Sequence, residues 1–223
     1  MSRLKRISFV VEGPTDYVLL DALVEHFLNS DDYVPTRIQP PISEFTNNSG
    51  PLGGGWKGVL KWCSMIGENP DSSPLTNCDF LIIHIDADIA GEAELASLNL
   101  SAECPPAATA CDNIRQHLAR LIGGSLVSGV ILCVPSQCME AWVLCALHTN
   151  EAKKFEPLEC RIEVERLLIG RPDRLVVNKS GAAKKQTNSY KLVANRFVAG
   201  WGQTTAICSQ AERFEAEFKS EFG

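Results

Sequence analysis

Asp79–Asp88, with the sequence DFLIIHIDAD, is the stretch that decides the fold expected of this chain. Its centre, Phe80–Ile85, is an almost unbroken apolar run and does not alternate apolar with polar residues. Such a strand is buried on both faces, as the central strands of a parallel sheet are when helices cover both sides. The run ends at Asp86, and Asp88 follows. The stretch therefore predicts a central parallel strand with two acids at its carboxyl end.

Upstream of this strand, the sequence predicts two further pairs of strand and helix. The apolar run Lys5–Val11 stops at an acid-glycine-proline turn, and leucines at three- to four-residue spacing then predict a helix over Pro14–Asn29. A short strand is expected at Thr36–Gln39. A loop rich in proline and glycine, Pro40–Gly55, separates it from a helix at Trp56–Ile66.

Downstream, the same alternation continues once more. Gly91–Pro106 is expected to be a loop and Ala107–Ile122 a helix, followed by a strand at Leu126–Val134 and a hydrophobic helix at Cys138–His148. Strands that alternate with helices in this way favour a doubly wound α/β fold. We therefore expect residues 1–149 to form a mainly parallel sheet of about four strands, flanked by helices.

Residues 150–223 show helical patterns but no further convincing strand. Helices are expected at Arg161–Leu168, Asn188–Ala199 and Thr205–Phe222, with a polar, basic loop at Arg171–Lys185 between the first two. This part of the chain is predicted to be a helical extension packed on the α/β domain.

Composition narrows the class of protein. The chain has 223 residues, of which 45% are hydrophobic, so it has enough apolar residues for a substantial core. No stretch approaches the roughly 20 apolar residues of a membrane helix, and the chain starts without a cleavable signal, so a cytoplasmic location is expected. Nine cysteines without a C-x-x-C pair are expected to be mostly buried, free thiols.

Three acids are expected at the same edge of the sheet. Glu12 follows the first strand, Asp86 the third and Glu140 the fourth, and ligands of parallel α/β sheets bind at the carboxyl ends of strands. Asp86 and Asp88 project to the same side of an extended segment, which suits one hard cation. Crowded carboxylates repel each other, so a divalent ion such as Mg²⁺ or Mn²⁺ would stabilise the set. Taken singly, each acid also fits a helix cap or a solvated turn.

Three sequence segments resemble the Toprim domain, which topoisomerases, bacterial primases and OLD-family nucleases share. FVVEGPTD (residues 9–16) and LIIHIDAD (residues 81–88) look like its two signature motifs. PSQCMEAWVL (residues 135–144) resembles stand-alone Toprim-like proteins of bacteria, including the RloB-like group. The resemblance covers roughly residues 5–148. It implies a Toprim-like, Rossmann-type sheet.

The resemblance also implies roles for the acids. Glu12 would serve in general acid/base work or metal binding, Asp86 with Asp88 would hold Mg²⁺, and Glu140 would belong to the same metal set. Asp16, one helical turn beyond Glu12, matches an acidic position of the family and would assist. Nothing in the chain resembles a catalytic-tyrosine domain of topoisomerases or a zinc module of primases, which argues against strand passage and primer synthesis.

Positive charge is local in a chain of net charge −6, which does not have the overall basic surface typical of nucleic-acid binding. The glycine turn before Lys57 lies at a predicted helix start and would hold a phosphate, unless it is simply a flexible loop. Lys179 or Lys184, in the basic loop, would stabilise transition-state charge, although a solvated loop is the default interpretation of such a run.

The expected function is Mg²⁺- or Mn²⁺-dependent hydrolysis of phosphodiester bonds in DNA or RNA, by a Toprim-like nuclease of a bacterial defence system. Two alternatives stay open. One is phosphatase or nucleotidyl-transfer chemistry on small nucleotides, which uses the same ions. The other is a non-catalytic partner subunit of an ATPase, because OLD nucleases are joined to ATPase domains and this chain has no Walker motif.

Overall fold

The computed structural model describes residues 4–28, 33–41, 51–70, 77–124 and 128–222. Parts of the predicted loop at 40–55 and the first residues of the predicted strand at 126–134 lie outside these ranges. In chain order the elements are β1 (Lys5–Val10), α1 (Pro14–Leu28), β2 (Tyr33–Gln39), α2 (Gly55–Glu68), β3 (Phe80–His84), η3 (Ala87–Gly91), η4 (Ala93–Leu98), α3 (Ala107–Leu121), β4 (Val130–Cys133), α4 (Met139–Leu147), α5 (Thr149–Ala152), η5 (Leu158–Cys160), η6 (Val164–Leu168), β5 (Val176–Lys179), β6 (Ala182–Lys185), α6 (Thr187–Ala199), α7 (Trp201–Ile207) and α8 (Ser209–Phe222).

The predicted parallel sheet is confirmed. In the described part of the chain it has four strands in the order β2-β1-β3-β4, and every neighbouring pair is parallel. β1 and β3 are the central strands. Their register pairs Val10 with Ile83, so both strands end at the same level of the sheet. This level sets where the acids that follow them lie.

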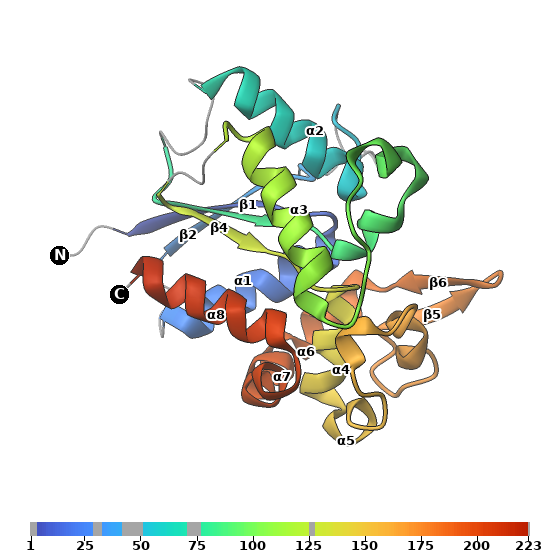
Figure 1. Ribbon diagram of the computed structural model, residues 1–223. Helices are drawn as coiled ribbons and strands as arrows, with labels where there is room; N and C mark the ends of the chain where they lie inside the picture. The colour runs from blue at the N-terminus through green and yellow to red at the C-terminus, as the bar shows by residue number, and fades with distance from the viewer. Residues whose placement is uncertain (1–3, 29–32, 42–50, 71–76, 125–127, 223) are drawn as a thin grey trace.

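Helices cover both faces of the sheet, with α2 and α3 on one side and α1, α6, α7 and α8 on the other (Figure 1). Successive residues of a strand point to opposite faces. Ile82 accordingly enters the core beneath α1 and the C-terminal helices, while Leu81 and Ile83 enter the core beneath α2 and α3. Both faces of β3 are buried, which explains its unbroken apolar sequence.

The prediction that no strand follows residue 150 is wrong. β5 and β6 form an antiparallel hairpin in place of the expected basic loop (Figure 1). Its turn is Ser180-Gly181. Both residues have positive φ, 53° and 85°, as in the two-residue loops that join the strands of tight hairpins. The hairpin was missed because its outer half carries small and basic residues, and only its base is apolar.

Two of the predicted C-terminal helices also differ from the structure. The segment 161–168 contains only the short 3₁₀ helix η6. The expected helix at 205–222 is split at Cys208, where the backbone is extended between α7 and α8. The Glu159 carboxylate accepts hydrogen bonds from the N–H groups of Ser209 (2.7 Å) and Gln210 (3.0 Å) at the start of α8. A remote side chain thus fixes this helix start.

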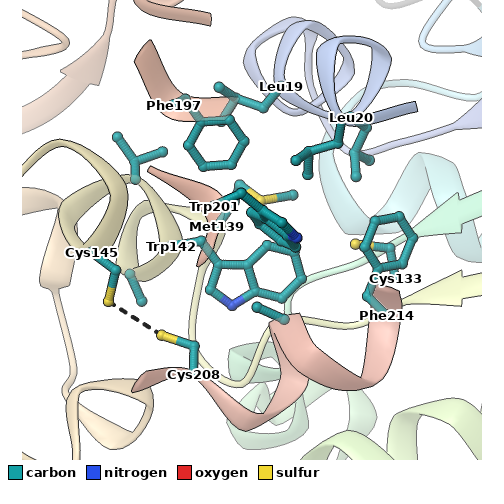
Figure 2. Close-up of a cluster of buried hydrophobic side chains, with 14 of the residues drawn as sticks. Leu19, Leu20, Cys133, Met139, Trp142, Cys145, Phe197, Trp201, Cys208 and Phe214 are labelled. Atoms are coloured by element: carbon teal, nitrogen blue, oxygen red, sulfur yellow. Dashed lines mark hydrogen bonds between the residues drawn. The ribbon is translucent and has the colours of Figure 1, made fainter. Parts of the chain in front are cut away.

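Residues 150–223 share a core with the sheet domain. Figure 2 shows the indole of Trp142, from α4, among Met139, Trp201 and Phe214. The Trp142 ring centroid lies 5.6 Å from that of Trp201, and Trp142 is fully buried. The C-terminal helices therefore complete the hydrophobic cover of one sheet face and do not form a separately cored unit.

The cysteines largely match the expectation of buried thiols, with one exception. Cys104 and Cys160 form a disulfide that joins the segment before α3 to η5. Within the core, the sulfur atoms of Cys145 and Cys208 lie 3.4 Å apart as free thiols (Figure 2).

Among the described residues, no helix combines the length and apolar character needed to cross a lipid bilayer.

We predict that Trp142→Ala lowers the free energy of unfolding by about 3–5 kcal/mol, because removing the indole leaves a cavity between the sheet and the C-terminal helices. Leu192→Ala, on the exposed side of α6 (84% exposed), should change it by less than about 0.5 kcal/mol. Denaturant unfolding measures both. Two separate unfolding transitions in the wild type, or equal effects of the two variants, would contradict a shared core.

Candidate metal centre

The ends of β1 and β3 bring the first two acids together. Glu12 lies two residues beyond β1 and Asp86 two residues beyond β3. The backbone N–H of Asp86 donates a 2.6 Å hydrogen bond to Oε1 of Glu12. The prediction that strand ends gather these acids at one edge therefore agrees with the geometry.

Asp86 also ties β3 to the start of α4. Its Oδ1 accepts a hydrogen bond from the N–H of Met139 (3.1 Å) and lies 3.4 Å from Nε2 of His84. Met139 is the first residue of α4, so this contact fixes the position of Glu140, which follows it. The Asp86 carboxylate thus links the end of β3 to the start of α4.

Glu140 is fully buried, and protein groups engage both of its oxygens. The Tyr190 hydroxyl donates to Oε1 (2.8 Å), and Nζ of Lys185 lies 2.8 Å from Oε2. Lys185 also lies 3.8 Å from Oδ1 of Asp16, which is buried on the first turn of α1. The lysine at the base of the hairpin is therefore inserted among the acids.

Asp88 is the exposed acid of the set and lies in η3. It lines a cavity of about 330 Å³ together with Gln137, Glu163 and Glu165, among others. The cavity gives solvent and a ligand access to this side of the carboxylate cluster.

Burial and neighbouring acids raise the pKa values of three carboxyl groups of the site. Burial and the nearby Asp86 raise the pKa of Glu12 well above its usual value. Desolvation by the surrounding protein and the charge of Asp86 raise the pKa of Asp88 to about 7, although its side chain reaches the surface. Burial raises the pKa of Glu140 even though Lys185 opposes this shift. Ionised carboxylates are costly here unless further positive charge is present.

The nearby cations respond in the opposite direction. Burial by itself would lower the pKa of His84, but the contact with Asp86 and the charges of Asp16 and Glu12 raise it to about 9. Burial also opposes the charged form of Lys185, yet the carboxylates raise its pKa well above the usual value. Both groups are held in their cationic forms by the acids.

The donor set suits Mg²⁺ or Mn²⁺ in its chemistry, because Glu12, Asp86 and Asp88 offer carboxylate oxygens. Their arrangement is not that of ligands around an ion: within the described residues, no three His, Cys, Asp or Glu side chains are grouped to hold a metal. Glu12 is turned to the N–H of Asp86 and would exchange that hydrogen bond for the ion. Glu140, predicted as a metal ligand, is instead paired with Lys185.

The glycine turn before α2 also lies beside the acids. The N–H of Gly55 donates to the carbonyl of Glu12 (2.9 Å), which places the start of α2 next to β1. A side chain at Gly58 would meet Gln39 and the carbonyl of Gly53, so only glycine fits there. Lys57, expected to support phosphate binding, pairs with Glu94 (2.6 Å).

The structure places the predicted lysines away from the carboxylates. Lys179 and Lys184 are exposed on the hairpin, whereas Lys185 reaches the site. Tyr190, interpreted as a packing residue from sequence, is buried and also binds Glu140 through its hydroxyl. His84 is a buried histidine, as expected, but contacts Asp86. The pairing of Val176 with Lys185 across the hairpin would have identified Lys185 as the lysine of the site, because it places Lys185 on the same face as a buried valine.

In comparisons with known proteins, no family model, curated protein or solved structure matches the chain.

We predict that Lys185→Met lowers the free energy of unfolding by about 3 kcal/mol, because it leaves the buried Glu140 carboxylate without its cation. Lys184→Met, one residue earlier and exposed, is the matched control and should change it by less than about 0.5 kcal/mol. Adding Glu140→Gln to Lys185→Met should recover part of the loss, which chemical denaturation measures. Equal effects of the two lysine variants would remove Lys185 from the buried cluster.

Divalent metal should stabilise the wild type and not Asp86→Asn/Asp88→Asn, because an ion that binds the folded state alone raises the melting temperature. Glu163→Gln, in the wall of the same cavity, is the control acid and should keep the response. Thermal melts with Mn²⁺ test this. A response that survives in the double variant places the metal elsewhere.

The metal response should also depend on pH. In metal-free protein the raised pKa of Asp88 favours its protonated form, so its contribution to stability is present at low pH and lost as pH rises through about 7. Metal requires the ionised form, so Mn²⁺ stabilisation should grow over that same interval. Melts at a series of pH values, with Asp88→Asn as control, test the trend; a response that is flat through pH 7 would contradict it.

Proposed function

We propose that this chain is a Toprim-like hydrolase that cleaves phosphodiester bonds in nucleic acid with Mg²⁺ or Mn²⁺. The observation that supports this most is the meeting of Glu12 and Asp86 at adjacent strand ends, with Asp88 beside them on an accessible cavity. Carboxylates crowded in this number form a site that gains stability from a divalent ion, and the pKa values of Glu12 and Asp88 are raised.

Glu12, Asp86 and Asp88 are the residues proposed to hold the ion. When bound, a divalent cation lowers the pKa of a coordinated water and screens the negative charge of a phosphate. Asp86 is held by the Met139 N–H, so its carboxylate is positioned before any ligand arrives. Asp88 lines the cavity, which is the route that we assign to the substrate.

Glu12 and Lys185 are assigned separate tasks. Burial and the nearby Asp86 raise the pKa of Glu12, which favours a carboxyl group that holds a proton and can exchange it with the water or the leaving oxygen. Lys185 brings a cation from the hairpin into the carboxylate cluster and takes the charge-stabilising role expected of Lys179. Glu140 pairs directly with this lysine, and the Tyr190 hydroxyl holds Glu140, so both are positioning residues.

The test is a cleavage assay with plasmid, single-stranded DNA, RNA and small phosphoesters in Mg²⁺ or Mn²⁺. We expect polymer cleavage that is absent in Asp86→Asn/Asp88→Asn and retained in Lys191→Ala, a change of an exposed lysine on α6. Lys185→Met should lower kcat by about a hundredfold, while Lys185→Arg should keep part of the rate. Circular dichroism confirms that the compared variants are folded.

The outcomes separate the alternatives. Hydrolysis of small phosphoesters without polymer cleavage would replace the nuclease by a phosphatase or nucleotidyl-transfer enzyme. Inactivity on all substrates, restored by an ATPase, would make the chain a partner subunit. Activity that persists in the double aspartate variant would contradict the proposed centre itself.

A further inference from the structure

We infer that the β5–β6 hairpin is a DNA-binding ribbon that enters the major groove of a duplex and sets the carboxylate cluster against the adjoining backbone. The inference rests on the proposed function and names its substrate as double-stranded DNA. Residues 178–182 are exposed, and the hairpin projects from the body of the molecule (Figure 1).

Charge on this segment runs against that of the whole chain. Residues 171–185 hold five lysines and arginines and one acid, Asp173, in a chain of net charge −6. Asp173 pairs with Arg196 and lies 3.3 Å from His148, away from the hairpin turn. The charged side chains on the outer part of the hairpin are therefore all positive, as contacts to a phosphate backbone require.

The register gives the hairpin two different faces. Val177 pairs with Lys184 and Lys179 with Ala182, and these side chains share one face because paired residues of antiparallel strands lie on the same side. Lys185 lies on the other face, where it contacts the carboxylates. Lys179 and Lys184 thus lie on the face of the hairpin that is turned away from the carboxylate cluster.

The dimensions suit a groove. Four residues per strand extend about 13 Å at roughly 3.3 Å per residue, and the major groove of B-form DNA is about 12 Å wide and about 8.5 Å deep and admits a two-stranded ribbon. The tip carries only small side chains, at Ser180, Gly181 and Ala182, so it stays narrow. The turn is closed by the Gly181 N–H donating to Oδ1 of Asn178 (2.9 Å).

The base of the ribbon is fixed to the catalytic side of the protein. Leu175 and Val176 are buried, and the N–H of Gln186 donates to the carbonyl of Leu175 (2.8 Å). Val176 also bridges to Ile169, and Lys185 holds Glu140. DNA bound on the ribbon would therefore meet the acids at a defined distance and angle.

Other nucleic acids fit this ribbon less well. The major groove of an RNA duplex is deep and narrow and does not admit such an element. Proteins that bind single strands present aromatic platforms for base stacking, and residues 174–187 contain no aromatic side chain. Both comparisons favour duplex DNA.

The test measures binding in EDTA, where a metal-dependent reaction does not proceed, by fluorescence anisotropy. The probes are a DNA duplex of about two helical turns, its separate strands, and an RNA duplex of the same sequence. The first variant is Lys179→Ala/Lys184→Ala. A second removes Asn178, Lys179, Ala182 and Ala183, so that Ser180-Gly181 closes the pair of Val177 with Lys184. Lys191→Ala is the control.

We expect the wild type and the control to prefer the DNA duplex by about tenfold or more. Shortening the ribbon should remove that preference. The double lysine variant should lower the slope of log affinity against log salt by about 1.8, since each phosphate contact adds about 0.9. Equal binding of all probes, tighter binding of RNA or single strands, or unchanged slope and affinity in both variants would each overturn the inference. The double lysine variant changes exposed residues only, so it decides the matter if the shortened ribbon does not fold.

Binding and cleavage fail independently. If the shortened ribbon loses the duplex preference but the wild type has no nuclease activity, the ribbon is supported and the proposed reaction is rejected. Metal-dependent cleavage that is unaffected by both ribbon variants would keep the reaction and reject the ribbon.

Discussion

Negative charge concentrated at the edge of a parallel sheet is the constraint on which this structure depends. The ends of β1 and β3 and the starts of α1 and α4 bring Glu12, Asp86, Asp16 and Glu140 to one place, and most of this place is buried. Lys185 and His84 supply the positive charge in contact with these acids. Burial, together with the charge of Asp86, still raises the pKa of Glu12, and burial raises the pKa of Glu140, so both carboxylates are costly to ionise. A divalent cation would add the positive charge that these carboxylates need when they are ionised, and this is the basis of the metal chemistry that we propose.

The same constraint links the C-terminal part of the chain to the sheet. Lys185 belongs to the hairpin, and Tyr190 to α6, yet both bind Glu140 on α4. Tyr190 also belongs to the core in which Trp142 meets Trp201 (Figure 2). Residues beyond 150 therefore form part of the wall around the buried carboxylates. The carboxylate cluster is therefore incomplete without the C-terminal region.

Sequence patterns predicted what local chemistry controls. The apolar run before Asp86 predicted a strand buried on both faces, and the acids after β1 and β3 were placed at one edge because parallel strands end together. The C-terminal region was less predictable. The hairpin has only a short apolar base, Leu175, Val176 and Val177, and the helix start at Ser209 depends on Glu159, fifty residues away. Lys185 was not distinguished from Lys179 because the face of a strand residue is set by register, and register is fixed by tertiary pairing.

Anomalous diffraction from crystals grown with Mn²⁺ tests the central claim most directly, because it locates the ion without relying on activity. The account predicts an anomalous peak at the carboxyl edge of the sheet, within about 2.0–2.3 Å of oxygens from Asp86 and Asp88, with Glu12 turned from the Asp86 N–H toward the ion. A structure in Mn²⁺ with no peak at this edge, and with Glu12 still accepting the hydrogen bond from Asp86, would contradict it.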